Sequence, residues 1–173
     1  MKKINAARLF AWVMVLAIPL WLGSCKNDGN NVTPSSSIEG SWKISGFKIN
    51  PAVDLLQTGQ STTDLFVAYK QLPIGNDIVD CLTSSVITFN SGGKISGTTG
   101  SKCSATTNAN PIDDNSTWKL DGTKLTITSG TEATTYDTVI SGNSLKLTFL
   151  AAEDYDGDGK NETYTRTLEL TKA

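Results

Sequence analysis

The sequence of 173 residues contains no histidine. Histidine is the commonest general base and metal ligand near neutral pH, so its absence excludes the Ser-His and Cys-His arrangements of nucleophilic enzymes. Catalysis by a pair of carboxylates or by lysine needs no histidine and is not excluded by the composition. No carboxylate pair is marked by its spacing as an acid and a base with separated pKa values. We therefore expect a protein that is not an enzyme.

The sequence also lacks an apolar run long enough to cross a bilayer, which takes roughly 20 residues. The longest run covers residues 9–22, follows Lys2, Lys3 and Arg8, and leads to Leu22-Gly23-Ser24-Cys25. This pattern is typical of a removable signal peptide. Its end resembles the lipobox of bacterial lipoproteins, which implies that residues 1–24 are removed and that Cys25 carries a diacylglycerol and an acyl chain such as palmitate. The alternative is an ordinary signal peptide that leaves Cys25 as a free thiol.

Residues 25–37 follow as a polar segment rich in turn formers, which we interpret as a flexible tether. Lys26 occupies the position where an inner-membrane retention signal would have aspartate, so we expect an outer-membrane anchor. The domain would then face either the periplasm or the cell surface, and the sequence leaves both open.

Basic residues are scarce after the signal peptide. Residues 1–25 hold three of the 15 Lys and Arg and none of the 17 Asp and Glu, which leaves 12 basic against 17 acidic residues, a net charge of −5. Arg166 is the one arginine left. This composition excludes the basic patch that a nucleic-acid partner requires.

Two cysteines remain after Cys25, namely Cys81 and Cys103. An even pair in an oxidising compartment predicts a disulfide. The alternative is two buried free thiols.

From residue 38 to residue 173 the dominant hydrophobic period is two, which predicts one all-β domain. Turn residues separate eight expected strands: 41–50, 85–89, 94–97, 117–120, 124–128, 134–140, 144–150 and 163–171. Gly46 could mark a bulge in the first strand. Residues 51–80 break the pattern, and 63–72 within them fit either a short helix capped by Ser61 or Thr62, or a strand. Eight such strands form an up-and-down barrel or a sandwich, and we favour the barrel because closure removes exposed edges.

Several of these segments resemble the lipocalin-like domains of bacterial outer-membrane lipoproteins. The resemblance rests on Ile38-Glu39-Gly40-Ser41-Trp42-Lys43-Ile44, on Cys81 with Ile87-Thr88-Phe89-Asn90, and on Cys103, Trp118-Lys119-Leu120 and Leu145-Lys146-Leu147. Gly40-x-Trp42 is similar to the Gly-x-Trp of lipocalins, in which an arginine from a late strand covers the tryptophan. The resemblance thus implies that Arg166 stacks on Trp42 as a structural contact that closes the barrel.

The sharpest local motif is acidic. Asp154, Asp156 and Asp158 recur at a spacing of two, and the carbonyl of Lys160 and the carboxylate of Glu162 could complete an oxygen shell for calcium. The motif resembles calcium loops between β-strands, and a structural calcium is expected. The alternative is a solvated acidic turn.

Two functions remain open. The first is a non-catalytic binding module, in which the barrel holds a small hydrophobic molecule or a glycan fragment near the membrane. The second is a structural or interaction lipoprotein whose barrel is filled and whose loops contact a protein partner. The two differ in whether aromatic side chains line an open pocket or an apolar patch lies on one loop face.

Overall fold

The computed structural model describes residues 37–104, 112, 115–155 and 158–173. These residues belong to one compact unit, Ser36–Ala173. The predicted signal peptide, Cys25, the tether up to residue 36 and Asp156 lie outside the described residues. Within the described ranges, no helix has both the length and the hydropathy needed to cross a membrane.

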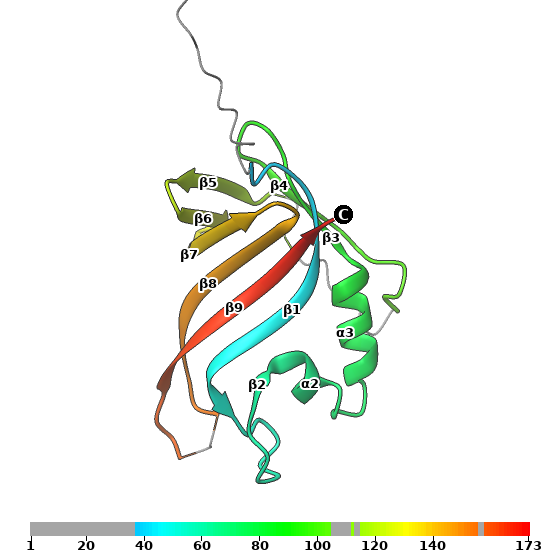
Figure 1. Ribbon diagram of the computed structural model, residues 1–173, viewed down its shortest axis with the longest axis vertical. Helices are drawn as coiled ribbons and strands as arrows, with labels where there is room; N and C mark the ends of the chain where they lie inside the picture. The colour runs from blue at the N-terminus through cyan, green and yellow to red at the C-terminus, as the bar shows by residue number, and fades with distance from the viewer. Residues whose placement is uncertain (1–36, 105–111, 113–114, 156–157) are drawn as a thin grey trace, which may run out of the picture. The chain divides into compact units, whose positions relative to one another are not determined.

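Strands dominate the unit. They are β1 (Gly40–Val53), β2 (Thr62–Asp64), β3 (Val86–Phe89), β4 (Ile95–Thr98), β5 (Thr117–Asp121), β6 (Lys124–Ser129), β7 (Glu132–Ser141), β8 (Ser144–Glu153) and β9 (Glu162–Lys172). Two helices, α2 (Leu65–Tyr69) and α3 (Gly75–Ser84), lie between β2 and β3. The antiparallel order is β4-β3-β1-β9-β8-β7-β6-β5, with β2 beside β1 (Figure 1).

The two ends of this order meet and nearly close a barrel. Lys94 and Thr117 form an antiparallel bridge between the segments that lead into β4 and β5. Beside it the Trp118 amide donates to the Gly93 carbonyl at 2.7 Å, and the Ile95 amide donates to the Ser116 carbonyl at 3.1 Å. The predicted fold, an eight-stranded up-and-down barrel, is therefore confirmed.

Tight turns and one bulge set the register, as the sequence predicts. Asp121 pairs with Lys124 across a two-residue turn, in which Gly122 adopts a positive φ of 59°. In β1 the register against β9 shifts between Ile44 and Gly46, which confirms the bulge. A Cβ at Gly46 would lie 2.7 Å from the carboxylate of Glu169, so the Glu169 side chain occupies the space that a side chain at the bulge would need.

One half of the barrel interior is filled. Trp42, Leu125, Leu145 and Leu170 are completely buried and belong to one apolar cluster. Phe66 of α2 and Val79 of α3 join the same cluster, so both helices pack against the barrel core. Buried apolar side chains therefore occupy this half of the barrel.

The segment 51–80 departs from the prediction in two ways. Residues 62–69 form both alternatives in succession, strand β2 and then helix α2. The cap of α2 is Asp64, not Ser61 or Thr62, because its Oδ1 accepts from the amides of Phe66 at 3.0 Å and Val67 at 3.4 Å. Helix α3 was not expected at all. It begins at Gly75, where a Cβ would lie 1.6 Å from the carbonyl oxygen of Tyr69.

Cys81 at the end of α3 and Cys103 after β4 form a disulfide, as predicted. Ser85 supports the same junction, because its hydroxyl donates to the Cys81 carbonyl at 2.8 Å and accepts from the Gly100 amide at 2.9 Å. The disulfide therefore fixes the helical segment to the sheet that follows it.

Candidate functional site

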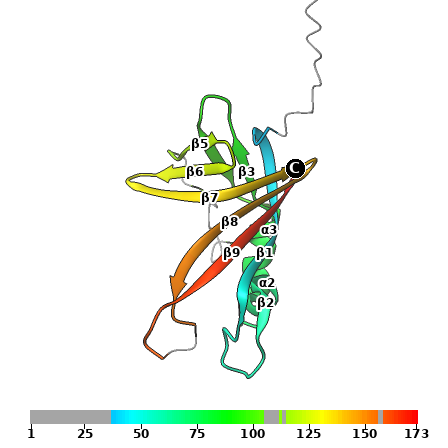
Figure 2. The same cartoon turned by 60° about the vertical axis from the view of Figure 1, so that its left-hand side comes forward.

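The barrel wall opens between β7 and β8. The two strands pair from Ser141 and Ser144 up to Asp137 and Thr148, and the ladder ends there. Residues 132–136 of β7 continue to pair with β6, and residues 149–153 of β8 continue to pair with β9. Among the described residues, neither segment has a pairing partner across the opening. Figure 2 shows the two strands diverging from this point.

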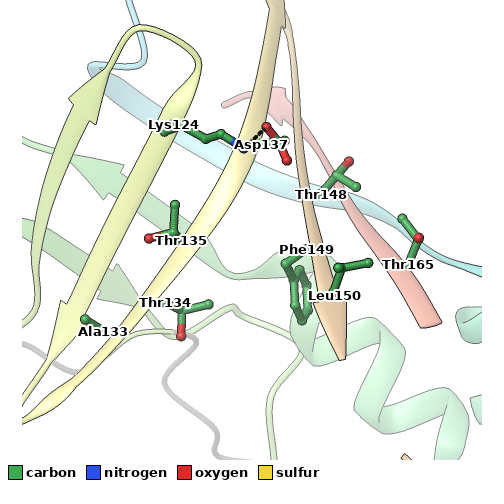
Figure 3. A pocket seen from close by; sticks show the side chains of 9 residues that line it. All are labelled: Lys124, Ala133, Thr134, Thr135, Asp137, Thr148, Phe149, Leu150 and Thr165. Carbon is green, nitrogen blue, oxygen red and sulfur yellow. Dashed lines mark hydrogen bonds and ion pairs between the residues drawn. The ribbon is translucent and has the colours of Figure 1, made fainter. Parts of the chain in front are cut away.

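A pocket of about 660 Å³ occupies this opening. Thr134 and Thr135 line it from β7, and Phe149 and Leu150 line it from β8 (Figure 3). The ion pair between Lys124 Nζ and Asp137 Oδ1, 2.6 Å long, lies where the two strands part. The volume falls within the range of pockets that hold small molecules.

Tyr136 and Phe149 form the inner wall of the opening. They are the next residues after the last pair of the ladder, and their rings meet edge to face with centroids 5.2 Å apart. Both side chains are only partly buried. Burial raises the pKa of the Tyr136 hydroxyl, although a hydrogen bond from Thr134 lowers it in part. Two aromatic rings with remaining exposure thus border the barrel interior.

Arg166 lies beside this aromatic pair and points into the barrel. It is opposite Phe149 on β8 and opposite Ile49 on β1. Its side chain is 18% exposed, and its Nη2 lies 3.4 Å from a carboxylate oxygen of Glu153. Nη2 also donates to the hydroxyl of Tyr155, whose ring centroid is 5.5 Å from the guanidinium carbon.

Two further tyrosines surround this arginine. The Tyr164 ring meets the Tyr155 ring edge to face, with centroids 4.9 Å apart. Burial raises the pKa of Tyr69, as do Tyr155 and Glu153, while the nearby charge of Arg166 lowers it. Tyr69 and Tyr155 both pack against the small apolar cluster that contains Tyr164.

The predicted contact between Arg166 and Trp42 is wrong. The ladder between β1 and β9 pairs Trp42 with Lys172 and places Arg166 six residues away, about 20 Å along an extended strand. The cation over the indole of Trp42 is Lys172, whose Nζ is 4.8 Å from the ring centroid. The inward direction predicted for Arg166 is correct, but its aromatic partner is Tyr155.

The acidic loop is described only in part, because Asp156 lies outside the described residues. The Asp154 carboxylate accepts from the Gly159 amide at 2.9 Å, and Asp158 accepts from the Lys160 amide at 2.8 Å. The Lys160 ammonium also contacts Asp158 at 3.1 Å. Glu162 lies opposite Glu153 at the start of β9, and its buried Oε2 has no hydrogen-bond partner in the part of the chain that the structure describes. Among the described side chains, no group of three acids, cysteines or histidines is placed to hold a metal ion. The calcium site stays a prediction.

Comparison with known proteins agrees with this geometry. The family model of the lipocalin-like domain matches residues 38–147, which span β1 to the first part of β8. The chain belongs to the lipocalin-like domain family. No curated protein and no solved structure matches it. Family membership indicates a binding module for small molecules, and the family generally consists of non-catalytic proteins.

The family match covers the β7 side of the opening in the lipocalin-like barrel and ends before its β8 side. Residues 149–153 and β9, which carry Phe149, Tyr155 and Arg166, follow the matched range. Alternation along the two strands places Phe149 and Arg166 on the inner face, but no residue pattern indicates that the ladder stops beside them. The pocket is thus lined from β7 by residues inside the matched range and from β8 and β9 by residues that follow it.

Proposed function

We propose that this protein is an exported lipoprotein whose lipocalin-like barrel binds a small apolar molecule in the opening between β7 and β8. The observation that carries the proposal is the partly exposed aromatic pair, Tyr136 and Phe149, beside a pocket of about 660 Å³. Buried side chains of the main apolar cluster occupy the other half of the barrel, which favours binding at this end. An apolar ligand would complete the burial of both rings, which favours association.

A fluorescence titration tests the proposal. N-phenyl-1-naphthylamine is neutral and fluoresces in apolar surroundings, and it would be added to the soluble chain from Lys26 onward. We expect saturable binding, weakened at least ten-fold by Phe149→Ala, because a buried aromatic contact contributes about 1.5–3 kcal/mol. Val139→Ala removes an exposed apolar side chain from the paired part of β7 and serves as the matched control.

A second variant protects the test against a folding defect. Thr134 lines the pocket and is exposed, so Thr134→Trp fills the opening without removing a core residue. It should weaken the binding of the dye while leaving the unfolding midpoint unchanged. Dye binding that neither variant alters contradicts the proposed site. Displacement of the dye by a soluble oligosaccharide, but not by apolar molecules, would favour a glycan ligand instead.

The proposal includes an outer-membrane anchor at Cys25. It is supported by the signal-like segment 1–24 and by Leu22-Gly23-Ser24-Cys25. In producing cells, radioactive palmitate should label the protein and leave it in the membrane fraction, and Cys25→Ser should abolish both. Labelling that survives this substitution contradicts the anchor. Protease added to intact cells distinguishes surface exposure from a periplasmic location.

A structural calcium in the loop between β8 and β9 is the remaining part of the proposal. Its support is the spacing of Asp154, Asp156 and Asp158, together with the turn at Gly159, whose φ is +85°. Calorimetric titration with calcium should give one site that Asp158→Asn weakens. Heat no greater than that of dilution would indicate a solvated acidic turn.

A further inference from the structure

Arg166 is an unusual side chain for the interior of this barrel. It is the one arginine after residue 25, and its neighbours across the ladders are the apolar Ile49 and Phe149. The side chain is largely removed from solvent. A guanidinium in such a place needs an anion and hydrogen bonds to offset its lost hydration.

The contacts that the protein itself supplies meet this need only in part: Nη2 donates to the neutral hydroxyl of Tyr155, and the one nearby anion is Glu153 among the described residues. The Glu153 carboxylate is 3.4 Å from Nη2, longer than the 2.7–2.9 Å of a good charge-assisted bond. The Nε atom is buried and has no hydrogen-bond partner among the described residues. A buried donor without a partner is costly, so the edge formed by Nε and Nη2 is prepared for an acceptor that the described residues do not provide.

Glu153 is also poorly held. It is half exposed and lies directly opposite Glu162, a pairing of like charges that destabilises an antiparallel ladder. Its movement into water would therefore cost little. Glu153 thus occupies the position of an acceptor that a stronger anion can replace.

From these contacts we infer that the ligand is an apolar carboxylic acid whose carboxylate binds the Nε and Nη2 edge of Arg166 and displaces Glu153. This inference rests on the proposed function and names its ligand class. A planar guanidinium matches the two oxygens of a carboxylate in a bidentate arrangement. Phe149 lines the pocket and is the ladder neighbour of Arg166, so a tail that covers Phe149 and Tyr136 carries its head group to the arginine.

The test compares two probes of equal chain length, dodecanoate and dodecan-1-ol, as competitors of N-phenyl-1-naphthylamine. We expect the acid to bind about ten- to a hundred-fold more tightly than the alcohol, the effect of a hydrogen-bonded charge. Arg166→Gln should abolish this preference, because it should weaken the binding of dodecanoate and leave the binding of dodecan-1-ol unchanged. Lys146→Gln is the matched control, because Lys146 forms an exposed ion pair with Glu169 on the neighbouring strand.

Glu153→Gln provides a second, opposite readout. Removal of the competing carboxylate should strengthen dodecanoate binding several-fold and leave dodecan-1-ol unchanged. Glu169→Gln removes an equal charge at a different position, on β9. It should change the binding of neither dodecanoate nor dodecan-1-ol. If Arg166→Gln does not fold, Glu153→Gln decides the question by itself.

The outcomes separate the inference from the proposed function. Equal binding of acid and alcohol by the unaltered protein, or an acid preference that survives Arg166→Gln, overturns the carboxylate site and leaves the apolar pocket standing. If the dye, dodecanoate and dodecan-1-ol all fail to bind, the proposed function is overturned together with this inference. Failure of Glu153→Gln to strengthen acid binding contradicts the displacement of Glu153.

Discussion

Lys172 covers the indole of Trp42. Its Nζ lies 4.8 Å from the ring centroid and also donates to the Glu39 carbonyl at 3.1 Å. Trp42 itself is completely buried and donates from Nε1 to the Ile38 carbonyl at 2.7 Å. A lysine of the last strand thus covers the tryptophan of the first strand, where the resemblance implied an arginine.

Substitutions at these two positions should differ strongly in effect. Trp42→Ala removes a buried ring and should lower the free energy of unfolding by about 3–5 kcal/mol. Lys172→Met removes only a cation over a ring and should cost about 0.5–1 kcal/mol. Urea unfolding measures both. An effect of Lys172→Met as large as that of Trp42→Ala would contradict the structure.

The disulfide should contribute substantially to stability. Cys81 and Cys103 are 22 residues apart, and a loop of that length corresponds to about 3 kcal/mol in the chain-entropy model. Replacing both cysteines with alanine should lower the free energy of unfolding by about this amount. Reductant should shift the urea midpoint of the unaltered protein in the same direction and leave the double variant unchanged. Equal midpoints for the oxidised and reduced protein would be the contrary result.

Two leucines of β8 test its orientation. Leu147 is 2% exposed and faces the core, whereas Leu150 is 71% exposed. Leu147→Ala should cost about 2–5 kcal/mol, and Leu150→Ala should stay within about 0.5 kcal/mol. Thermal or urea unfolding of the two variants checks this. The reverse order would mean that β8 is shifted by one residue.

Asp64 should make the stability of the α2 region depend on pH. Burial acts to raise its pKa, but Lys48 at 2.5 Å and the amides of Phe66 and Val67 outweigh burial and lower the pKa below the ordinary 3.8. A carboxyl with a lowered pKa in the folded state stabilises that state above pH 3.8. The contribution is lost as the pH falls through the lower folded value.

The corresponding measurement is urea unfolding at pH 7 and at pH 2. Asp64→Ala should cost about 1 kcal/mol at pH 7, the usual effect of losing a helix cap. The difference from the unaltered protein should shrink at pH 2. Asp64→Asn keeps an oxygen acceptor but does not titrate, so it is the matched control. A difference that is the same at both pH values would exclude ionised Asp64 as the cause.

The barrel could be predicted from the sequence because its causes are local. Alternation places Ile87 and Leu145 on the inner face, and turn residues such as Gly122 fix where each hairpin reverses. Helix α3 escaped prediction because the helix depends on tertiary contacts, namely the close approach of Gly75 to Tyr69 and the disulfide at Cys81. A pattern of period two elsewhere gives no information about such contacts.

The candidate site was harder to predict than the fold. The alternation of side chains along β9 correctly places Arg166 on the inner face. Its aromatic partner depends on the register of β9 against β1, which alternation does not determine. The opening depends on where pairing of β7 with β8 stops, between Asp137 and Tyr136. No residue type at that point marks the end of a ladder, since β7 continues with Thr134, Thr135 and Tyr136 and β8 with Phe149 and Leu150. The site is therefore a product of strand divergence, which requires the three-dimensional structure.

The most direct test of the central claim is an amide NMR titration of the chain from Lys26 onward with N-phenyl-1-naphthylamine. The account predicts that signals of residues 132–136 and 149–153, on the two sides of the opening, shift together and saturate together. The indole signal of Trp42, in the filled half, should not move. Shifts confined to α2 and α3, or a moving Trp42 signal with unchanged signals at the opening, would contradict binding between β7 and β8.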